Sequence, residues 1–113
     1  MLFRLIVSLD NATYVYQLFA DNQLPQQKYK FETIENKTGI AVVNGSQEMS
    51  VYAGITKTVG EVEIIHFDKG EQRLKIQAHK SAIISIALNN DGSLIATASQ
   101  KGQVIRIFKT DNG

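Results

Sequence analysis

The sequence consists of many short stretches rich in β-branched and aromatic residues, separated by pairs of turn residues. β-branched and aromatic side chains favour strands, whereas Asn, Asp and Gly tolerate the positive φ of tight hairpins. The turn pairs are Asp10-Asn11, Asp21-Asn22, Asn44-Gly45, Lys69-Gly70, Asp91-Gly92 and Lys101-Gly102. No segment keeps an apolar period of 3.6 over about eleven residues, so the sequence predicts an all-β fold with essentially no helix.

Ten strands are predicted between these turns. They cover Phe3–Leu9, Thr13–Leu18, Gln27–Thr33, Ile40–Val43, Met49–Ile55, Glu61–Phe67, Gln72–Gln77, Ser81–Leu88, Leu94–Ser99 and Gln103–Lys109.

An internal repeat selects among the all-β architectures. The segment Gly60–Ile65 aligns with Gly102–Ile107 at an offset of 42 residues, and a weaker match joins Thr13–Leu18 to Val62–Phe67 at an offset of 49. A period near 40–45 residues with four short strands per repeat is typical of a β-propeller blade. We therefore predict a partial β-propeller of four-stranded antiparallel blades, similar to WD repeats.

The ten strands divide into three blades. Residues 1–35 form a partial blade without its innermost strand, residues 36–78 a complete blade, and residues 79–113 a partial blade without its outermost strand. Because a propeller closes with about four to eight blades, these strands make an open arc. We expect a piece of a larger propeller, completed by further sequence or by another chain. The alternative is a small closed barrel or sandwich, which a gel-filtration mass of the isolated chain would distinguish.

Composition limits the function classes. The 113 residues include no cysteine, which excludes disulfides and thiolate metal sites. A net charge of +1 argues against general nucleic-acid binding. The apolar run Leu2–Leu9 is far shorter than the roughly 20 residues that cross a bilayer, and no signal-peptide cleavage site follows it. We therefore expect a cytosolic chain.

Residues 78–108 resemble one WD repeat; they read AHKSAIISIALNNDGSLIATASQKGQVIRIF. In such repeats a His, a Ser or Thr, an Asp and a Trp form a buried hydrogen-bonded tetrad. His79 and Ser99 occupy the first two positions, but Lys101 stands in place of the Asp and Phe108 in place of the Trp. A cation has therefore replaced the stabilising acid.

The same stretch resembles the PROPPIN family more closely, through the pattern ATAS-x-KG-x-x-IR-x-F. The resemblance continues through FETIENKTGIAVV, GEVEIIHF and LIVSLDNATYVYQL, and so covers nearly the whole chain. It implies a seven-bladed propeller that binds phosphatidylinositol 3-phosphate and 3,5-bisphosphate in autophagy and endosomal traffic. It also implies a peripheral protein that meets autophagy proteins at preautophagosomal, endosomal or vacuolar membranes.

Two departures from the family pattern affect the expected site. Gln103 stands where the family usually has Thr, and the chain stops at Gly113, before a Phe/Leu-Arg-Arg-Gly motif would follow. In the family that motif supplies two arginines that anchor two lipid headgroups. The resemblance also implies a hydrophobic membrane-inserting loop on a later blade, outside this chain.

The resemblance implies four phosphoinositide-binding residues: Arg106, which matches a residue of the family's first pocket, and His79, Ser99 and Lys101 by position. Independently, a phosphomonoester carries about −1.5 to −2 charges, which suits a planar guanidinium, an ammonium and neutral donors placed together. Residues 71–113 carry six bases against three acids.

Other roles remain open for three of these residues. Arg106 could pair with an acid of a neighbouring blade, His79 could be held by Ser99 as a remnant of the tetrad, and Lys101 could be solvated only.

Catalysis is not expected. The histidine bases are His66 and His79, and there is neither a Gly-x-Ser-x-Gly elbow nor a glycine-rich phosphate loop. His66 and Asp68 lack an evident third metal ligand. We therefore expect no enzyme activity, no cofactor and no metal. The second hypothesis is a WD-type protein-interaction scaffold without a lipid ligand, completed by strand addition at an open edge.

Overall fold

A computed structural model describes residues 2–19, 24–45, 50–68, 70–101 and 104–113. Within these ranges the chain forms strands and turns, and no helix is long and apolar enough to cross a membrane. The strands are β1 (Leu2–Ser8), β2 (Ala12–Phe19), β3 (Gln26–Glu32), β4 (Ala41–Val43), β5 (Val51–Ile55), β6 (Glu61–His66), β7 (Gln72–Gln77), β8 (Ile83–Leu88), β9 (Leu94–Ser99) and β10 (Ile105–Lys109).

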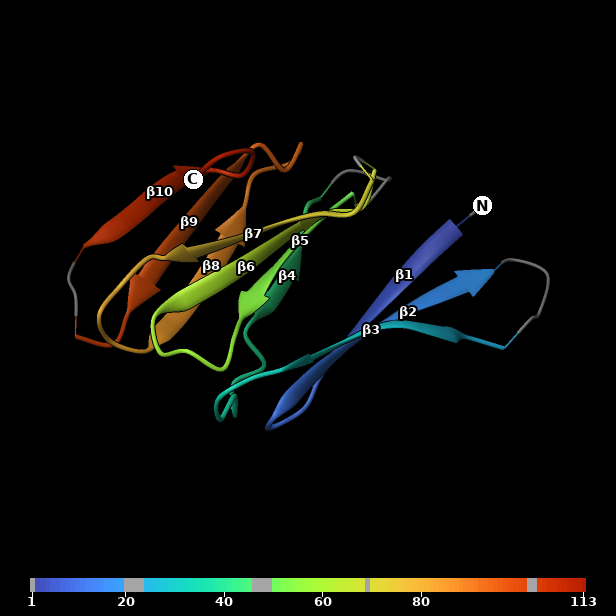
Figure 1. The fold of residues 1–113 in the computed structure, drawn as a ribbon, viewed down its shortest axis with the longest axis horizontal. Coiled ribbons are helices and arrows are strands. Elements are labelled where there is room, and N and C mark those ends of the chain that lie inside the picture. The colour runs from blue at the N-terminus through green and yellow to red at the C-terminus, as the bar shows by residue number, and fades with distance from the viewer. Residues whose placement is uncertain (1, 20–23, 46–49, 69, 102–103) are drawn as a thin grey trace.

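The strands form three antiparallel sheets, ordered β1-β2-β3, β4-β5-β6-β7 and β8-β9-β10. In each sheet, every strand pairs with the strand that precedes it in sequence. Figure 1 shows the first sheet (blue to cyan), the second (green to yellow) and the third (orange to red) as separate units. The all-β prediction is confirmed. The described strands form three separate sheets, which fits neither a closed barrel, which is one continuous sheet, nor a sandwich, which has two.

The strand boundaries follow the prediction closely. For example, β6 ends one residue before the predicted end at Phe67, and β8 begins at Ile83 rather than at Ser81. The predicted strand starts at Met49 and Gln103, and the turn Asp21-Asn22, lie outside the described residues, as do Lys69 and Gly102 of two other turns. The blade boundaries at residues 35/36 and 78/79 stay predictions.

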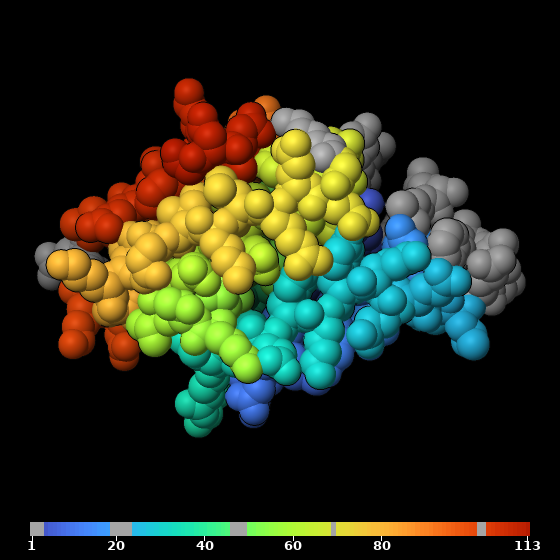
Figure 2. Space-filling view, in the orientation of Figure 1, coloured from blue at the N-terminus to red at the C-terminus, as the bar shows by residue number. Residues whose placement is uncertain are grey.

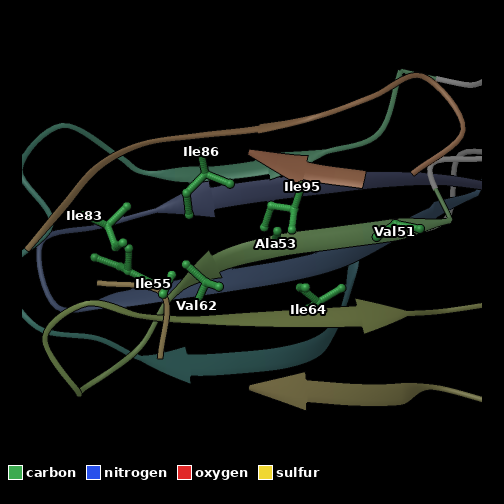
Figure 3. Close-up of a cluster of buried hydrophobic side chains, with 9 residues drawn as sticks. Val51, Ala53, Ile55, Val62, Ile64, Ile83, Ile86 and Ile95 are labelled. Atoms are coloured by element: carbon green, nitrogen blue, oxygen red, sulfur yellow. The ribbon is translucent and has the colours of Figure 1, made fainter. Parts of the chain in front are cut away.

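The second sheet is buried on both faces because it lies between the other two. Successive residues of a strand point to opposite faces, so Val62 and Ile64 of β6 join one core cluster while Ile65 joins another. Figure 3 shows the first cluster, in which β5 and β6 side chains pack against the third sheet. Its members are Val51, Ala53, Ile55, Val62, Ile64, Ala78, Ile83, Ile86 and Ile95.

Aromatic residues form the core between the first and second sheets. Phe31 of β3 stacks on Tyr52 of β5, with ring centroids 5.2 Å apart. The Arg73 guanidinium of β7 lies 5.6 Å from the centroid of Phe31 and covers this cluster from outside. Figure 2 shows β3 (cyan) lying against β7 (yellow) on this side of the molecule.

Two contacts tie the second sheet to the segments of the third. The carbonyl oxygen of Gly60, in the β5–β6 turn, accepts hydrogen bonds from the backbone N–H groups of Ala78 (3.0 Å) and His79 (3.1 Å). At the other end, His66 Nε2 lies 2.9 Å from the Thr110 carbonyl oxygen, to which it donates. The first contact determines where the chain enters the third sheet.

The other face of the third sheet is exposed in this structure. Its apolar side chains include Ile84, Ile105 and Ile107, of which Ile105 is 69% exposed. A single soluble blade would not normally leave such a face in water, because burying it is favourable. This exposure is consistent with an open arc.

Candidate functional site

One hollow of about 450 Å³ gathers all four residues predicted to bind phosphoinositide. Three segments form it: the connection between β7 and β8, the end of β9 with the turn that follows, and the start of β10. Its lining consists of His79, Lys80, Ser81, Ser99, Lys101, Val104 and Arg106.

Arg106 reaches the hollow through the alternation of β10. The strand pairs with β9 in a register that sets Arg106 opposite Thr97. Phe108, two residues along, packs against the core cluster, whereas Ile105 and Ile107 are exposed on the opposite face. Arg106 Nη1 donates to the carbonyl oxygen of Ala78 at 2.6 Å. This contact holds the guanidinium against the connection before β8, and a guanidinium has further N–H donors for an anion.

His79 is almost fully buried, with 6% of its surface exposed. Its Nε2 lies 2.8 Å from Thr97 Oγ1. The hydroxyl at this nitrogen belongs to Thr97 and not to Ser99, which the sequence had offered as the alternative role of the pair. Both Thr97 and Ser99 are buried on the same face of β9, two residues apart, and strand alternation alone cannot choose between them.

Lys101 and Arg106 line the same hollow rather than opposite sides of the sheet. The backbone N–H of Lys101 donates to Ser81 Oγ at 3.4 Å, which ties the turn to the connection before β8. The Lys101 side chain is exposed, and Ser99 is buried beside it.

Two further residues contribute to this site and were not predicted from the sequence: Lys80, which lines the hollow, and Thr97, which is bonded to His79. Lys80 follows His79 directly in the sequence and lines the hollow. With Lys101 and Arg106 it supplies three cationic side chains, while none of the lining residues is acidic. A concave site lined by one sign of charge attracts an anion of the opposite sign.

The hollows between the first and second sheets have a different character. One of them, about 750 Å³ in volume, is lined by both acids and bases, among them Asp10, Lys30, Glu32 and Lys57. Lys57 Nζ lies 2.6 Å from Glu32 Oε2, and this contact keeps the pKa of Glu32 below its usual value. Its charges therefore largely compensate one another, unlike those around Arg106.

Metal ligands are not grouped in the part of the chain that the structure describes, since no three His, Asp or Glu side chains there are arranged to hold an ion. His66, considered in the sequence as a base or a ligand, is 5% exposed and bonded to the Thr110 carbonyl.

Comparisons with known proteins agree on one family. The PROPPIN family model matches residues 2–113. The chain is 32% identical over 133 aligned residues to autophagy-related protein 18 of Aspergillus oryzae, covering 97% of this chain and 31% of that protein. It is 31% identical over 109 residues to SVP1-like protein 2 of Emericella nidulans, covering 96% of this chain and 32% of that protein.

The fold is likewise similar to that of solved structures. Kluyveromyces lactis Hsv2 superposes with a TM-score of 0.77 at 18% identity, over 100% of this chain and 35% of that one. The chain thus spans about a third of the length of the relatives that it matches. The predicted partial propeller is confirmed, and the chain belongs to the PROPPIN family.

Proposed function

We propose that this chain provides one wall of a phosphoinositide-binding site, for phosphatidylinositol 3-phosphate or 3,5-bisphosphate, in a peripheral membrane effector of autophagy or endosomal traffic. The observation that carries the proposal is the single hollow shared by His79, Ser99, Lys101 and Arg106, with Lys80 as a further cation. Membership of the PROPPIN family and similarity to autophagy-related protein 18 support it.

The donor types suit a phosphorylated inositol headgroup. The guanidinium of Arg106 offers paired N–H donors to two phosphate oxygens, whereas the Lys101 ammonium acts as a compact charge that follows the ligand. The Ala78 carbonyl oxygen accepts a hydrogen bond from Arg106 and so holds the guanidinium in place. Part of the conformational entropy that this side chain would lose on binding is therefore already lost before the ligand arrives.

In this proposal the protein binds membranes reversibly through electrostatic contacts. It acts from the cytoplasm on preautophagosomal, endosomal or vacuolar membranes, with autophagy proteins as partners. Each base near an anionic surface contributes about 1 kcal/mol. A binding role suits the site better than catalysis, because Thr97, the hydroxyl nearest to His79, is only 1% exposed and out of reach of a substrate.

Arg106→Ala and Lys101→Ala are each expected to weaken recruitment to vesicles that contain phosphatidylinositol 3-phosphate by about ten- to a hundredfold. A hydrogen bond to a charged group contributes about 1.5–3 kcal/mol, and each 1.4 kcal/mol is tenfold in affinity. Flotation with these vesicles, against vesicles of unphosphorylated phosphatidylinositol, measures the effect.

Lys109→Ala is the matched control for this experiment. Lys109 is also an exposed cation on β10, but it does not line the hollow. It should therefore leave recruitment within about twofold of the unmodified chain, since only general surface charge is lost. If both site variants float as the control does, the site assignment fails and a protein-interaction scaffold without lipid becomes the better explanation.

A further inference from the structure

A second hollow, of about 440 Å³, lies between the first and second sheets and shares no lining residue with the hollow around Arg106. Strand β3, the turn between β5 and β6, β6 itself and β7 form its walls. Figure 2 shows β3 (cyan) and β7 (yellow) side by side on this face of the molecule. Four basic and three acidic side chains line the hollow, and the way in which they are arranged indicates what it can bind.

Glu63 is the buried acid of this hollow, with 8% of its surface exposed. Its neighbours Val62 and Ile64 point into the core cluster on the other face of β6, so the Glu63 side chain faces the first sheet. Lys75 stands opposite on β7, yet the carboxylate makes no hydrogen bond or ion pair with the residues that the structure describes. A buried charge without a partner is costly, and it therefore points to a ligand.

A second polar group without a partner lies beside this carboxylate. The hydroxyl of Tyr52 is buried and has no hydrogen-bond partner among the described residues. It fills the space that a Cβ at Gly54 would occupy, and Gly54 is paired with Glu63 in the register of β5 and β6. Burial raises the pKa of the Tyr52 hydroxyl, and the negative charge of Glu63 raises it further. The surroundings of Glu63 are therefore polar but incomplete.

The other two acids of the hollow already have partners. Glu32 Oε2 lies 2.6 Å from Lys57 Nζ. Glu61 Oε1 accepts a hydrogen bond from Thr56 Oγ1 at 2.7 Å. Among the acidic lining residues, Glu63 is therefore the one left to pair with a ligand.

Exposed bases surround this buried acid. Arg73 and Lys75 lie on β7 and Lys30 lies on β3, all with exposed side chains. The Arg73 guanidinium lies 5.6 Å from the centroid of the Phe31 ring, which holds its charge above the hollow. A buried negative group within a basic rim is complementary to a ligand of the opposite arrangement, with a positive tip and acidic flanks.

From this arrangement we propose that the hollow binds an extended segment of a partner protein through one arginine or lysine side chain, which reaches Glu63. A guanidinium or ammonium has several donors and no acceptor, so it can form charge-assisted hydrogen bonds with the carboxylate. Successive residues of an extended segment lie about 3.3 Å apart, so one segment can place acids on both sides of its basic anchor. Those acids meet Arg73 and Lys75. The proposal is independent of the phosphate site.

The test uses the full chain and a synthetic peptide in which one arginine stands between two pairs of glutamates. Calorimetry should show that this peptide binds at least about tenfold more tightly than the same peptide with citrulline, which has a similar shape but no charge. It should also bind at least about tenfold more tightly than argininamide, which lacks the flanking acids. Equal binding of the citrulline peptide overturns the cationic anchor. Equal binding of argininamide overturns the protein segment as the ligand, in favour of a small cation.

Glu63→Gln should weaken binding of the arginine peptide by about ten- to a hundredfold, because the charge-assisted hydrogen bonds are lost. Glu61→Gln is the matched control. Glu61 is also an acid of this hollow, but Thr56 already bonds it, so binding should stay within about twofold. If both variants bind the peptide equally, the proposal fails. The comparison of peptides on the unmodified chain decides the question even if Glu63→Gln does not fold.

The stability of Glu63→Gln separates a ligand site from a structural role. Without peptide, an amide should be tolerated at least as well as an unpaired buried carboxylate, so the urea midpoint of unfolding should stay the same or rise. A lower midpoint would show that Glu63 already has a partner in the free chain, which overturns the proposal. Arg106→Ala should leave peptide binding unchanged, because Arg106 lines the other hollow. A loss of binding there would mean that the peptide occupies the phosphate site instead.

Discussion

Gly60→Ala is expected to lower the free energy of unfolding by at least about 3 kcal/mol. Gly60 has a φ of +78°, and an added Cβ would overlap the carbonyl oxygen of His79. The left-handed conformation alone costs an alanine about 1–2 kcal/mol, and the overlap must in addition displace the backbone that follows β7. That backbone carries His79, and its Ala78 carbonyl oxygen accepts the hydrogen bond from the Arg106 guanidinium. The variant should therefore also weaken phosphate binding.

Gly70→Ala is the control for this prediction. Gly70 has a similar φ of +70°, but a Cβ there meets none of the described atoms within 4 Å. It should cost only the conformational part, about 1–2 kcal/mol, and leave binding unchanged. Urea unfolding of both variants measures the difference. Equal losses would show that the contact between Gly60 and His79 does not hold the third sheet in place.

Ile95→Ala should destabilise the chain by about 2–5 kcal/mol, as for other large-to-small changes in a core. Ile95 of β9 has no exposed surface and lies in the cluster between the second and third sheets (Figure 3). The variant removes apolar contacts and leaves a cavity that two packed sheets cannot fill by relaxing.

Ile107→Ala on the adjacent strand tests the orientation of the same sheet. Ile107 is 66% exposed, so its loss should change the unfolding free energy by less than about 0.5 kcal/mol. Thermal unfolding of the two variants provides the comparison. A large loss for Ile107→Ala would mean that the outward face is covered in solution and that the third sheet has a further packing partner.

The agreement between sequence and structure has a simple physical origin in β6 and β10. Stretches of β-branched and aromatic residues separated by turn pairs predicted both strands, and the structure then shows Val62 and Ile64 in the core and Arg106 at the hollow. The repeat at an offset of 42 residues indicated equivalent strands in two sheets. These are local properties of the backbone and of composition.

The errors arose where two alternatives satisfy the same local pattern. Thr97 and Ser99 share one face of β9, and either hydroxyl could have met His79. Lys80 sits in a connection, whose path depends on tertiary contacts rather than on alternation. The backbone hydrogen bonds from Ala78 and His79 to Gly60 bring the segment before β8 to the level of Thr97.

The sequence by itself determined the class of fold and the positions of the strands, because β-branched stretches and turn residues act over a few neighbouring positions. The resemblance to the PROPPIN family rested instead on motif residues such as those of residues 96–108. Only the tertiary structure decided that His79, Lys80, Lys101 and Arg106 share one hollow, and that Thr97 holds the histidine. These contacts join residues up to 28 positions apart, as between Ala78 and Arg106, and they depend on how one sheet docks on the next.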